Sequence, residues 1–314
     1  MVPSRTEFRA VREHFALAQV AAVEKDWHVV RALRAVTAVN ADPFRLAFAG
    51  GTTLARAHKL VQRMSEDVDL KIVLPEGVVL SGNRRRIQLG ALRDRITSSL
   101  QAAGFAIDPK DERQLRSRDA NAYTCYQLSY APLEGQGIQL RPTLQVELSY
   151  APLRLPPVSL PLSTFVAEAH RQAPEIAVIE CVSVTETAAE KLVALTRRSA
   201  MVQAVPGTPN DSTLVRHLYD LHTIRRHADR PRLIELARLI AQQDAYDFRY
   251  RYPAYLADIP GESRRGLSFW TQPGAGPQLY SNFVAAMVYG EAAEFGAALA
   301  TFKDLVDATW PALT

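Results

Sequence analysis

The chain has 314 residues, of which 47% are hydrophobic and 22% charged, and its formal net charge is +4. This length favours about two domains, and the composition is ordinary for a soluble protein with enough apolar residues for a sizeable core. Residues 1–15 contain no apolar signal region and no long apolar run occurs, which excludes a secretory signal and a membrane span, so we expect a cytoplasmic protein.

The two cysteines, Cys125 and Cys181, are far apart and fit no metal-ligand spacing. We expect buried thiols in a reducing compartment. The small positive excess comes almost entirely from arginine, whose guanidinium group suits phosphate and nucleic acid. A GC-rich genome would raise the arginine content equally, so charge alone gives RNA contact only modest support.

The hydrophobic pattern before the first proline-rich stretch changes between helical and strand periods. In chain order it predicts one or two helices within residues 7–39, a strand over 44–48, a helix over 52–61, a strand over 68–74, a helix over 84–103, and strands over 105–107, 123–131 and 140–150. A polar turn at 134–137 joins the last two strands. This order is typical of an α+β sheet domain.

After residue 152 the character of the sequence changes, with Pro156, Pro157 and Pro161 marking a linker. The later pattern predicts helices over 186–198, 213–227, 230–244 and 282–310, with Pro/Gly-rich interruptions at 205–210 and 271–278. We therefore predict two domains, residues 1–155 and residues 156–314, of which the second is mainly helical.

The most informative segment pairs Gly50 and Gly51 with Asp67 and Asp69. Two glycines let the backbone approach phosphate oxygens, and the next helix directs its free N–H groups at that anion. Two acids spaced two apart on a strand share one face, which suggests magnesium. A lone Gly-Gly is usually a turn and a lone Asp-x-Asp is usually a solvated strand end. Together, one helix length apart, they are far more specific.

These residues carry a family resemblance. The Gly-Gly-Thr at 50–52 and the Arg-x-Ser-x-Asp-x-Asp at 63–69 resemble the AbiEii/AbiGii toxin family of the polymerase-β-like nucleotidyltransferase superfamily. That family includes toxins of abortive-infection, phage-defence systems and the mycobacterial MenT toxins. Residues 190–197 resemble its Lys-x-x-Ala helix and 216–221 its Arg-Asp-x-x-Asp-Leu helix, although His217 stands where an acid is usual.

The resemblance implies a mixed sheet with flanking helices, plus a C-terminal helical domain that completes the active site and contacts the acceptor. It implies that Gly50, Gly51 and Thr52 hold a triphosphate. It also implies that Asp67 and Asp69 bind the metals, two Mg²⁺ ions with Mn²⁺ as an alternative.

Other side chains extend the expected site. The resemblance implies that Lys191 neutralises phosphate charge and that Asp220 orients it or helps activate the acceptor, although a lone lysine is usually a surface residue. We expect Glu147 to be the third metal ligand, because an acid inside a strand needs a partner; an outward-facing residue is the alternative. Arg63 would clamp a phosphate, pair with the first acid or interact with a helix C-terminus, while Ser65 would orient the nucleotide-binding turn.

The implied reaction is attack on the α-phosphorus of a nucleoside triphosphate, with pyrophosphate leaving and two metals stabilising the reacting oxygens. The resemblance implies an RNA acceptor, with the 3′ end of tRNA expected, so that its extension blocks translation. It also implies a cognate antitoxin protein and no membrane partner.

Basic and aromatic clusters give partial support to an RNA acceptor. Arginines gather at 84–86, 93–95, 113–118, 197–198 and 225–226, where they could line a groove for a polyanion. Phe248, Tyr250, Tyr252 and Tyr255 could stack on unpaired bases. Solvated helix faces and a packed tyrosine-rich loop explain the same residues equally simply.

Three rival functions share these motifs. A small-molecule nucleotidyltransferase of the antibiotic-modifying type would need a narrow or acidic acceptor pocket and would act without RNA. A non-catalytic nucleotide-binding module is favoured by His217 but opposed by the retained acids. Transfer of phosphate in place of a nucleotide uses the same electrostatics.

Overall fold

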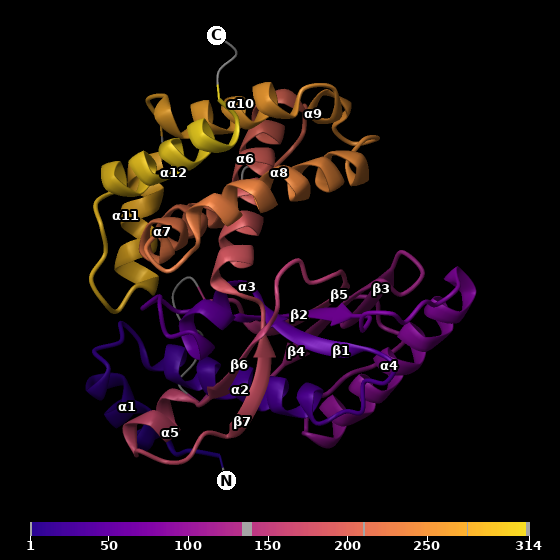
Figure 1. Ribbon diagram of the computed structural model, residues 1–314. Coiled ribbons are helices and arrows are strands. Elements are labelled where there is room, and N and C mark those ends of the chain that lie inside the picture. Colours follow the sequence, from indigo (N-terminus) through magenta and orange to yellow (C-terminus); the bar gives the residue numbers. More distant parts are fainter. Residues whose placement is uncertain (1, 134–139, 210, 275, 312–314) are drawn as a thin grey trace. The chain divides into compact units, whose positions relative to one another are not determined.

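The computed structural model describes residues 2–133, 140–209, 211–274 and 276–311, and the chain divides into two compact units, Met1–Val182 and Ser183–Thr314 (Figure 1). The boundary follows residue 182 and not residue 155, because residues 158–181 contribute two strands to the sheet of the first unit. The predicted turn at 134–137 lies outside the described residues.

The first unit is a mixed sheet with flanking helices, which confirms the predicted α+β fold class. Its elements are α1 (Arg5–His14), α2 (Val20–Thr37), β1 (Arg45–Ala49), α3 (Gly50–Thr52), η1 (Thr53–Ala57), β2 (Asp67–Val73), α4 (Gly82–Ala102), β3 (Leu115–Arg118), β4 (Tyr123–Ser129), β5 (Thr143–Tyr150), β6 (Val158–Leu162), α5 (Phe165–Ala169) and β7 (Ile176–Cys181). Within the described residues, seven strands form one sheet in the order β3-β4-β5-β2-β1-β7-β6. The β2–β5 and β1–β7 pairs are parallel and the other pairs are antiparallel.

The side chains of the central strand β2 alternate between a buried apolar face of the sheet and a polar face. Val68, Leu70 and Ile72 belong to the main core, which also includes buried residues of α2 and α4. Because side chains alternate along a strand, Asp67 and Asp69 lie on the opposite face. The alternating sequence of β2 therefore presents both acids on the face that α2 and α4 do not cover.

Two predicted elements of this unit differ in the structure. The helix expected over 52–61 is reduced to α3 and the π-helical turn η1, which ends at Ala57. The strand expected over 105–107 is only an isolated bridge between Ala106 and Ser129. The predicted proline linker contains the edge strand β6, where Pro161 is tolerated because an edge strand leaves some N–H positions without a ladder partner.

All the named secondary-structure elements in the described residues of the second unit are helices. Its elements are α6 (Val184–Ala204), η2 (Ser212–Leu214), α7 (Val215–Ile224), α8 (Arg230–Asp247), α9 (Pro253–Ala257), α10 (Ile259–Thr271), α11 (Gly276–Met287) and α12 (Phe295–Thr309). The helices predicted over 186–198, 213–227 and 230–244 are confirmed, whereas the one predicted over 282–310 is two helices. A Cβ at Gly266 of α10 would overlap the backbone of Thr196 in α6, so glycine permits the close packing of these helices.

Among the residues that the structure describes, none of the helices has the length and apolar character needed to cross a membrane.

Candidate active site

The turn after β1 brings backbone against one of the two acids. Gly50 has φ +76°, in the left-handed region that favours glycine, and a Cβ there would overlap the carboxylate of Asp69. A Cβ at Gly51 would likewise overlap the guanidinium group of Arg63. The glycine pair therefore lets this turn lie directly against two charged side chains of the candidate site.

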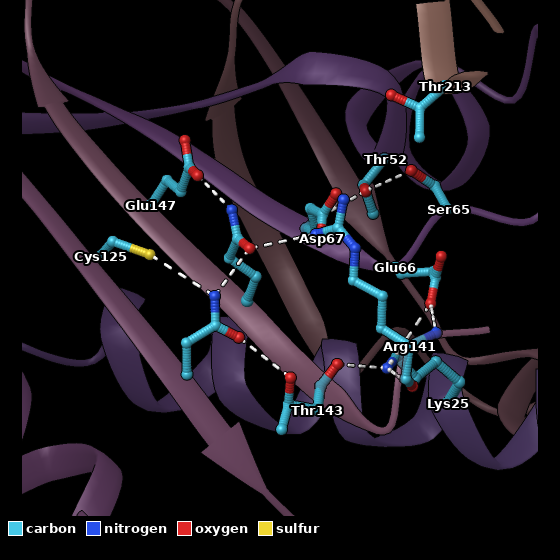
Figure 2. Close-up of polar contacts among 12 residues, drawn as sticks. Lys25, Thr52, Ser65, Glu66, Asp67, Cys125, Arg141, Thr143, Glu147 and Thr213 are labelled. Carbon is cyan, nitrogen blue, oxygen red and sulfur yellow. Dashed lines mark hydrogen bonds and ion pairs between the residues drawn. The ribbon is translucent and has the colours of Figure 1, made fainter. Parts of the chain in front are cut away.

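Thr52 connects this turn to the start of β2 (Figure 2). It is 1% exposed, and its Oγ1 hydrogen-bonds to Oγ of Ser65 at 2.8 Å and donates to the carbonyl oxygen of Asp67. Arg63 is 3% exposed and donates from Nη1 to the carbonyl oxygen of Met64 at 2.9 Å. Thr52 and Arg63 thus hold the turn in place; their expected contacts with a nucleotide stay predictions.

The acids of β2 lie beside polar residues of β5. Asp67 is in register with Gln145, and Asp69 with Glu147, and partners in register share a face of the sheet. Cys125 of β4 is in register with Glu147 and extends the row. We call this surface, formed by Asp67, Asp69, Gln145, Glu147 and Cys125, the acid face. The register places Glu147 next to the pair of acids, as its predicted role requires.

The charge of Glu147 affects two neighbours from β4. Burial raises the pKa of the Tyr123 phenol, and the nearby Glu147 carboxylate raises it further. Burial and then Glu147 also raise the pKa of the Cys125 thiol. Both neighbours are therefore held more firmly in their neutral forms.

Arg141, which sequence reasoning missed, lies against the first acid (Figure 2). Its Nη1 is 2.8 Å from Oδ1 of Asp67 and donates to Oε1 of Gln145 at 3.1 Å. Gln145 in turn donates from Nε2 to Oε1 of Glu147. A chain of polar contacts therefore connects Arg141 with two of the expected metal ligands.

A buried ion pair holds the backbone around Arg141. Lys25 of α2 is fully buried, and its Nζ donates to the carbonyl oxygens of Arg141, at 2.8 Å, and Thr143. Glu66 is 1% exposed, lies 3.7 Å from Lys25 Nζ and accepts from the backbone N–H of Arg141 at 2.6 Å. Burial lowers the pKa of Lys25, while the Glu66 carboxylate opposes that shift. One signal in the sequence could have indicated that Lys25 is buried: it precedes the core residue Val29 by one helical turn, so both lie on the same face of α2.

Among the described residues, no group of three or more His, Cys, Asp or Glu side chains is arranged to hold a metal ion. Asp67 and Glu147 are instead engaged by Arg141 and Gln145. The chemistry of the donor set nevertheless suits Mg²⁺ or Mn²⁺, because hard cations prefer carboxylate oxygens. Metal binding by Asp67, Asp69 and Glu147 stays a prediction.

The two expected residues of the second unit form a buried ion pair. Lys191 of α6 and Asp220 of α7 are 2.8 Å apart, Nζ to Oδ2, with side-chain exposures of 8% and 0%. Nδ1 of His217 lies 3.5 Å from the same Nζ. Lys191 is therefore not an ordinary surface lysine, and the unusual His217 adjoins it.

The aromatic set expected to stack on bases is mostly unsuited to that role. Tyr252 and Tyr255 are 1% and 0% exposed and stack on one another with ring centroids 5.7 Å apart. Phe248 lies under the guanidinium group of Arg197, 3.8 Å from the ring centroid. Tyr250 is 85% exposed. The expectation was wrong for Tyr252 and Tyr255, because both rings fill the core of the second unit.

Comparisons with known proteins identify the family of the chain and a solved structure with a similar fold. No curated protein matches the chain. A solved structure of MenT4, a nucleotidyltransferase toxin from Mycobacterium tuberculosis H37Rv, matches over 94% of this chain and 98% of its own, with 19% identity and a TM-score of 0.50, which shows a shared fold. The model of the nucleotidyl transferase AbiEii toxins of type IV toxin–antitoxin systems matches residues 31–307. The chain therefore belongs to the AbiEii family of nucleotidyltransferase toxins.

Proposed function

We propose that this toxin transfers a nucleotide from a nucleoside triphosphate to an RNA hydroxyl, with the 3′ end of tRNA as acceptor, and thereby stops translation. The main observation in favour of a metal-dependent reaction is that Asp67, Asp69 and Glu147 lie on neighbouring strands of the acid face. Membership of the family supports nucleotidyl transfer and a cognate antitoxin.

Asp67, Asp69 and Glu147 would hold two Mg²⁺ ions, or Mn²⁺. When bound, these ions would stabilise negative charge on the attacking and leaving oxygens. Arg141 lies 2.8 Å from Oδ1 of Asp67, so a metal ion at that oxygen would have to displace its guanidinium group. The position of Asp69 against Gly50 keeps this carboxylate beside the turn where a triphosphate would lie.

The reaction forms one bond and breaks another at the α-phosphorus. The acceptor hydroxyl oxygen attacks that phosphorus, its proton passes to a nearby carboxylate, and the bond to pyrophosphate breaks. Lys191 would contribute positive charge toward the phosphates, and Asp220, 2.8 Å from its Nζ, would fix the direction of that ammonium group. The helical unit would in this way complete the site and contact the acceptor.

An RNA acceptor is supported by exposed arginines on the first unit. Arg84, Arg116 and Arg118 are exposed, and guanidinium groups bind phosphate through paired donors. Because Tyr252 and Tyr255 are buried and unable to stack on bases, contact with phosphates is the main support for an RNA acceptor. Extension of an RNA terminus then requires backbone recognition more than recognition of base identity.

Labelled nucleotides test this proposal directly. Purified protein is incubated with total RNA, Mg²⁺ and each α-labelled triphosphate in turn, beside γ-labelled ATP. Label should enter small RNA from one preferred α-labelled triphosphate. Asp69→Asn should lower transfer by on the order of a hundred-fold or more, because a lost ligand removes several kcal/mol of transition-state stabilisation.

Asp119→Asn is the matched control, because Asp119 is an exposed loop residue and should leave transfer unchanged. Label on a small molecule without RNA would favour a small-molecule acceptor. Transfer of the γ-label would identify phosphate transfer. No label on any acceptor, with folded protein, would contradict the proposed enzyme.

A further inference from the structure

The free edge of the sheet at β3 carries a basic cavity. It has a volume of about 550 Å³, and its lining includes four cations, Arg93 from α4, Lys110, and Arg116 and Arg118 from β3, against two acids, Asp94 and Glu112. We call these four cations and the space between them the β3-edge groove. Its cations come from three segments of the first unit, so the fold gathers them.

Three of these four cations have no hydrogen-bond or ion-pair partner among the residues that the structure describes. Lys110, Arg116 and Arg118 are exposed, and their side chains make no hydrogen bond or ion pair within the described ranges. Arg93 is partly engaged, by Asp94 at 2.8 Å and by Asn121 at 3.2 Å. The β3-edge groove therefore presents donors that an external anion can take, which distinguishes it from the ion-paired Arg197 and Arg198 of the second unit.

Strand register connects this groove with the acid face. Asp69 pairs with Glu147, Glu147 with Cys125, and Cys125 with Arg116. All four therefore lie on one face of the sheet, and adjacent strands are about 4.8 Å apart, so Arg116 is about 14 Å from Asp69 along the row. The next row on this face runs from Lys71 through Ser149 and Tyr123 to Arg118.

The sign of the charge changes along this row. The acids lie on β2 and β5, the buried Cys125 of β4 lies between, and the cations lie on β3. A triphosphate held near Asp69 leaves the edge cations unengaged, because they lie three strands away. A polymer whose terminal hydroxyl reaches Asp69 can extend its earlier phosphates across β4 to β3.

We propose that the β3-edge groove binds the phosphodiester backbone of the RNA acceptor and directs its terminus toward the acid face. This inference rests on the proposed function. The contacts are between guanidinium or ammonium groups and phosphates, so they set the path of the strand and carry no base preference.

The test compares two double variants. Arg116→Gln with Arg118→Gln removes two groove cations, and Arg5→Gln with Arg34→Gln removes two exposed cations from α1 and α2. Binding of labelled bulk tRNA is measured against salt concentration. The groove variant should bind on the order of ten-fold more weakly at low salt, and its salt slope should fall by about one to two, because two phosphate contacts are lost.

Further readouts separate acceptor binding from the rest of the reaction. The KM for RNA should rise in the groove variant, while the affinity for the triphosphate and the melting temperature stay at wild-type values. The control variant should match wild type in each measurement.

The possible results distinguish a failure of the groove assignment from a failure of the proposed transfer to RNA. If wild-type protein neither binds nor labels RNA, the proposed function fails and the inference fails with it. If wild type labels RNA and the two double variants bind it equally, the groove assignment alone is overturned. If the groove variant lost more binding to polyglutamate than to tRNA, the groove assignment would also be overturned, in favour of an acidic protein partner.

Discussion

Gly50 is the residue at which the turn after β1 meets the carboxylate of Asp69. Gly50→Ala should lower the free energy of unfolding through its positive φ, by about 1 kcal/mol, and through overlap with Asp69, by roughly 1–3 kcal/mol more. Displacement of Asp69 should also abolish transfer. Urea unfolding and pyrophosphate release measure the two effects.

Gly77 provides the control, because its φ is +77° and a Cβ there would contact nothing within 4 Å. Gly77→Ala should show the backbone strain alone and keep full activity. Equal losses of stability and activity in both variants would show that contact with Asp69 is unimportant.

Arg141 competes with any divalent cation for Asp67. Removal of its guanidinium group by Arg141→Ala should tighten Mn²⁺ binding to the nucleotide-free protein by about two- to five-fold, since a partly exposed ion pair contributes up to about 1 kcal/mol. Arg141→Lys, which keeps the charge, should show a smaller change. Electron paramagnetic resonance titration of free Mn²⁺ measures both; an unchanged affinity in Arg141→Ala would argue against Asp67 as a ligand.

At the scale of elements, the contact between α6 and α7 depends on the buried pair of Lys191 and Asp220. Lys191→Met or Asp220→Asn should each destabilise the second unit by roughly 3–5 kcal/mol, because each removes one charge of a buried ion pair. The double variant should lose less stability than the sum of the two. If Lys191 also serves the phosphates, the double variant should stay inactive despite its recovered stability.

Urea unfolding followed by tryptophan fluorescence, beside the transfer assay, separates these effects. If the double variant recovered both activity and stability, Lys191 and Asp220 would have a purely structural role.

Helix α2 carries a histidine whose burial makes stability depend on pH. Burial, followed by the charges of Arg31 and Lys25, lowers the pKa of His28 from 6.5 to about 4. The unfolded chain therefore binds a proton more readily than the folded protein does. The contribution of His28 is fully present above pH 6.5 and is lost as the pH falls toward about 4, by roughly 3 kcal/mol.

His28→Gln should therefore lose about 3 kcal/mol less stability than wild type across that pH range. Urea unfolding at several pH values measures the difference. His14→Gln, at an exposed histidine of α1, should follow wild type. Parallel pH curves for His28→Gln and wild type would contradict the assignment.

At the scale of the whole molecule, each of the two units has its own buried core, so a cavity in one should act mainly on that unit. Leu195 of α6 is 0% exposed, and Leu195→Ala should destabilise the helical unit by roughly 2–5 kcal/mol. Hydrogen exchange should accelerate in α6, α7 and α8, with protection in β2 and β5 retained. An equal loss of protection in both units would show that they unfold as one.

Local sequence was enough to predict part of the fold. The turn after β1, the strand β2, and the helices α4, α6 and α8 follow from glycine positions and from periodicity within one segment. The strands β3, β6 and β7 were missed, because short polar or proline-containing segments become strands only when a neighbour supplies the hydrogen bonds.

The sequence by itself determined the two acids on one face of β2, since a separation of two residues fixes that geometry in any strand. It also determined the family, through the order of its motifs. Only the tertiary structure decided that Glu147 adjoins Asp69, that Arg141 engages Asp67, and that Lys191 meets Asp220. These pairs join residues from separate elements, and strand register and helix packing, which no local pattern encodes, bring them together.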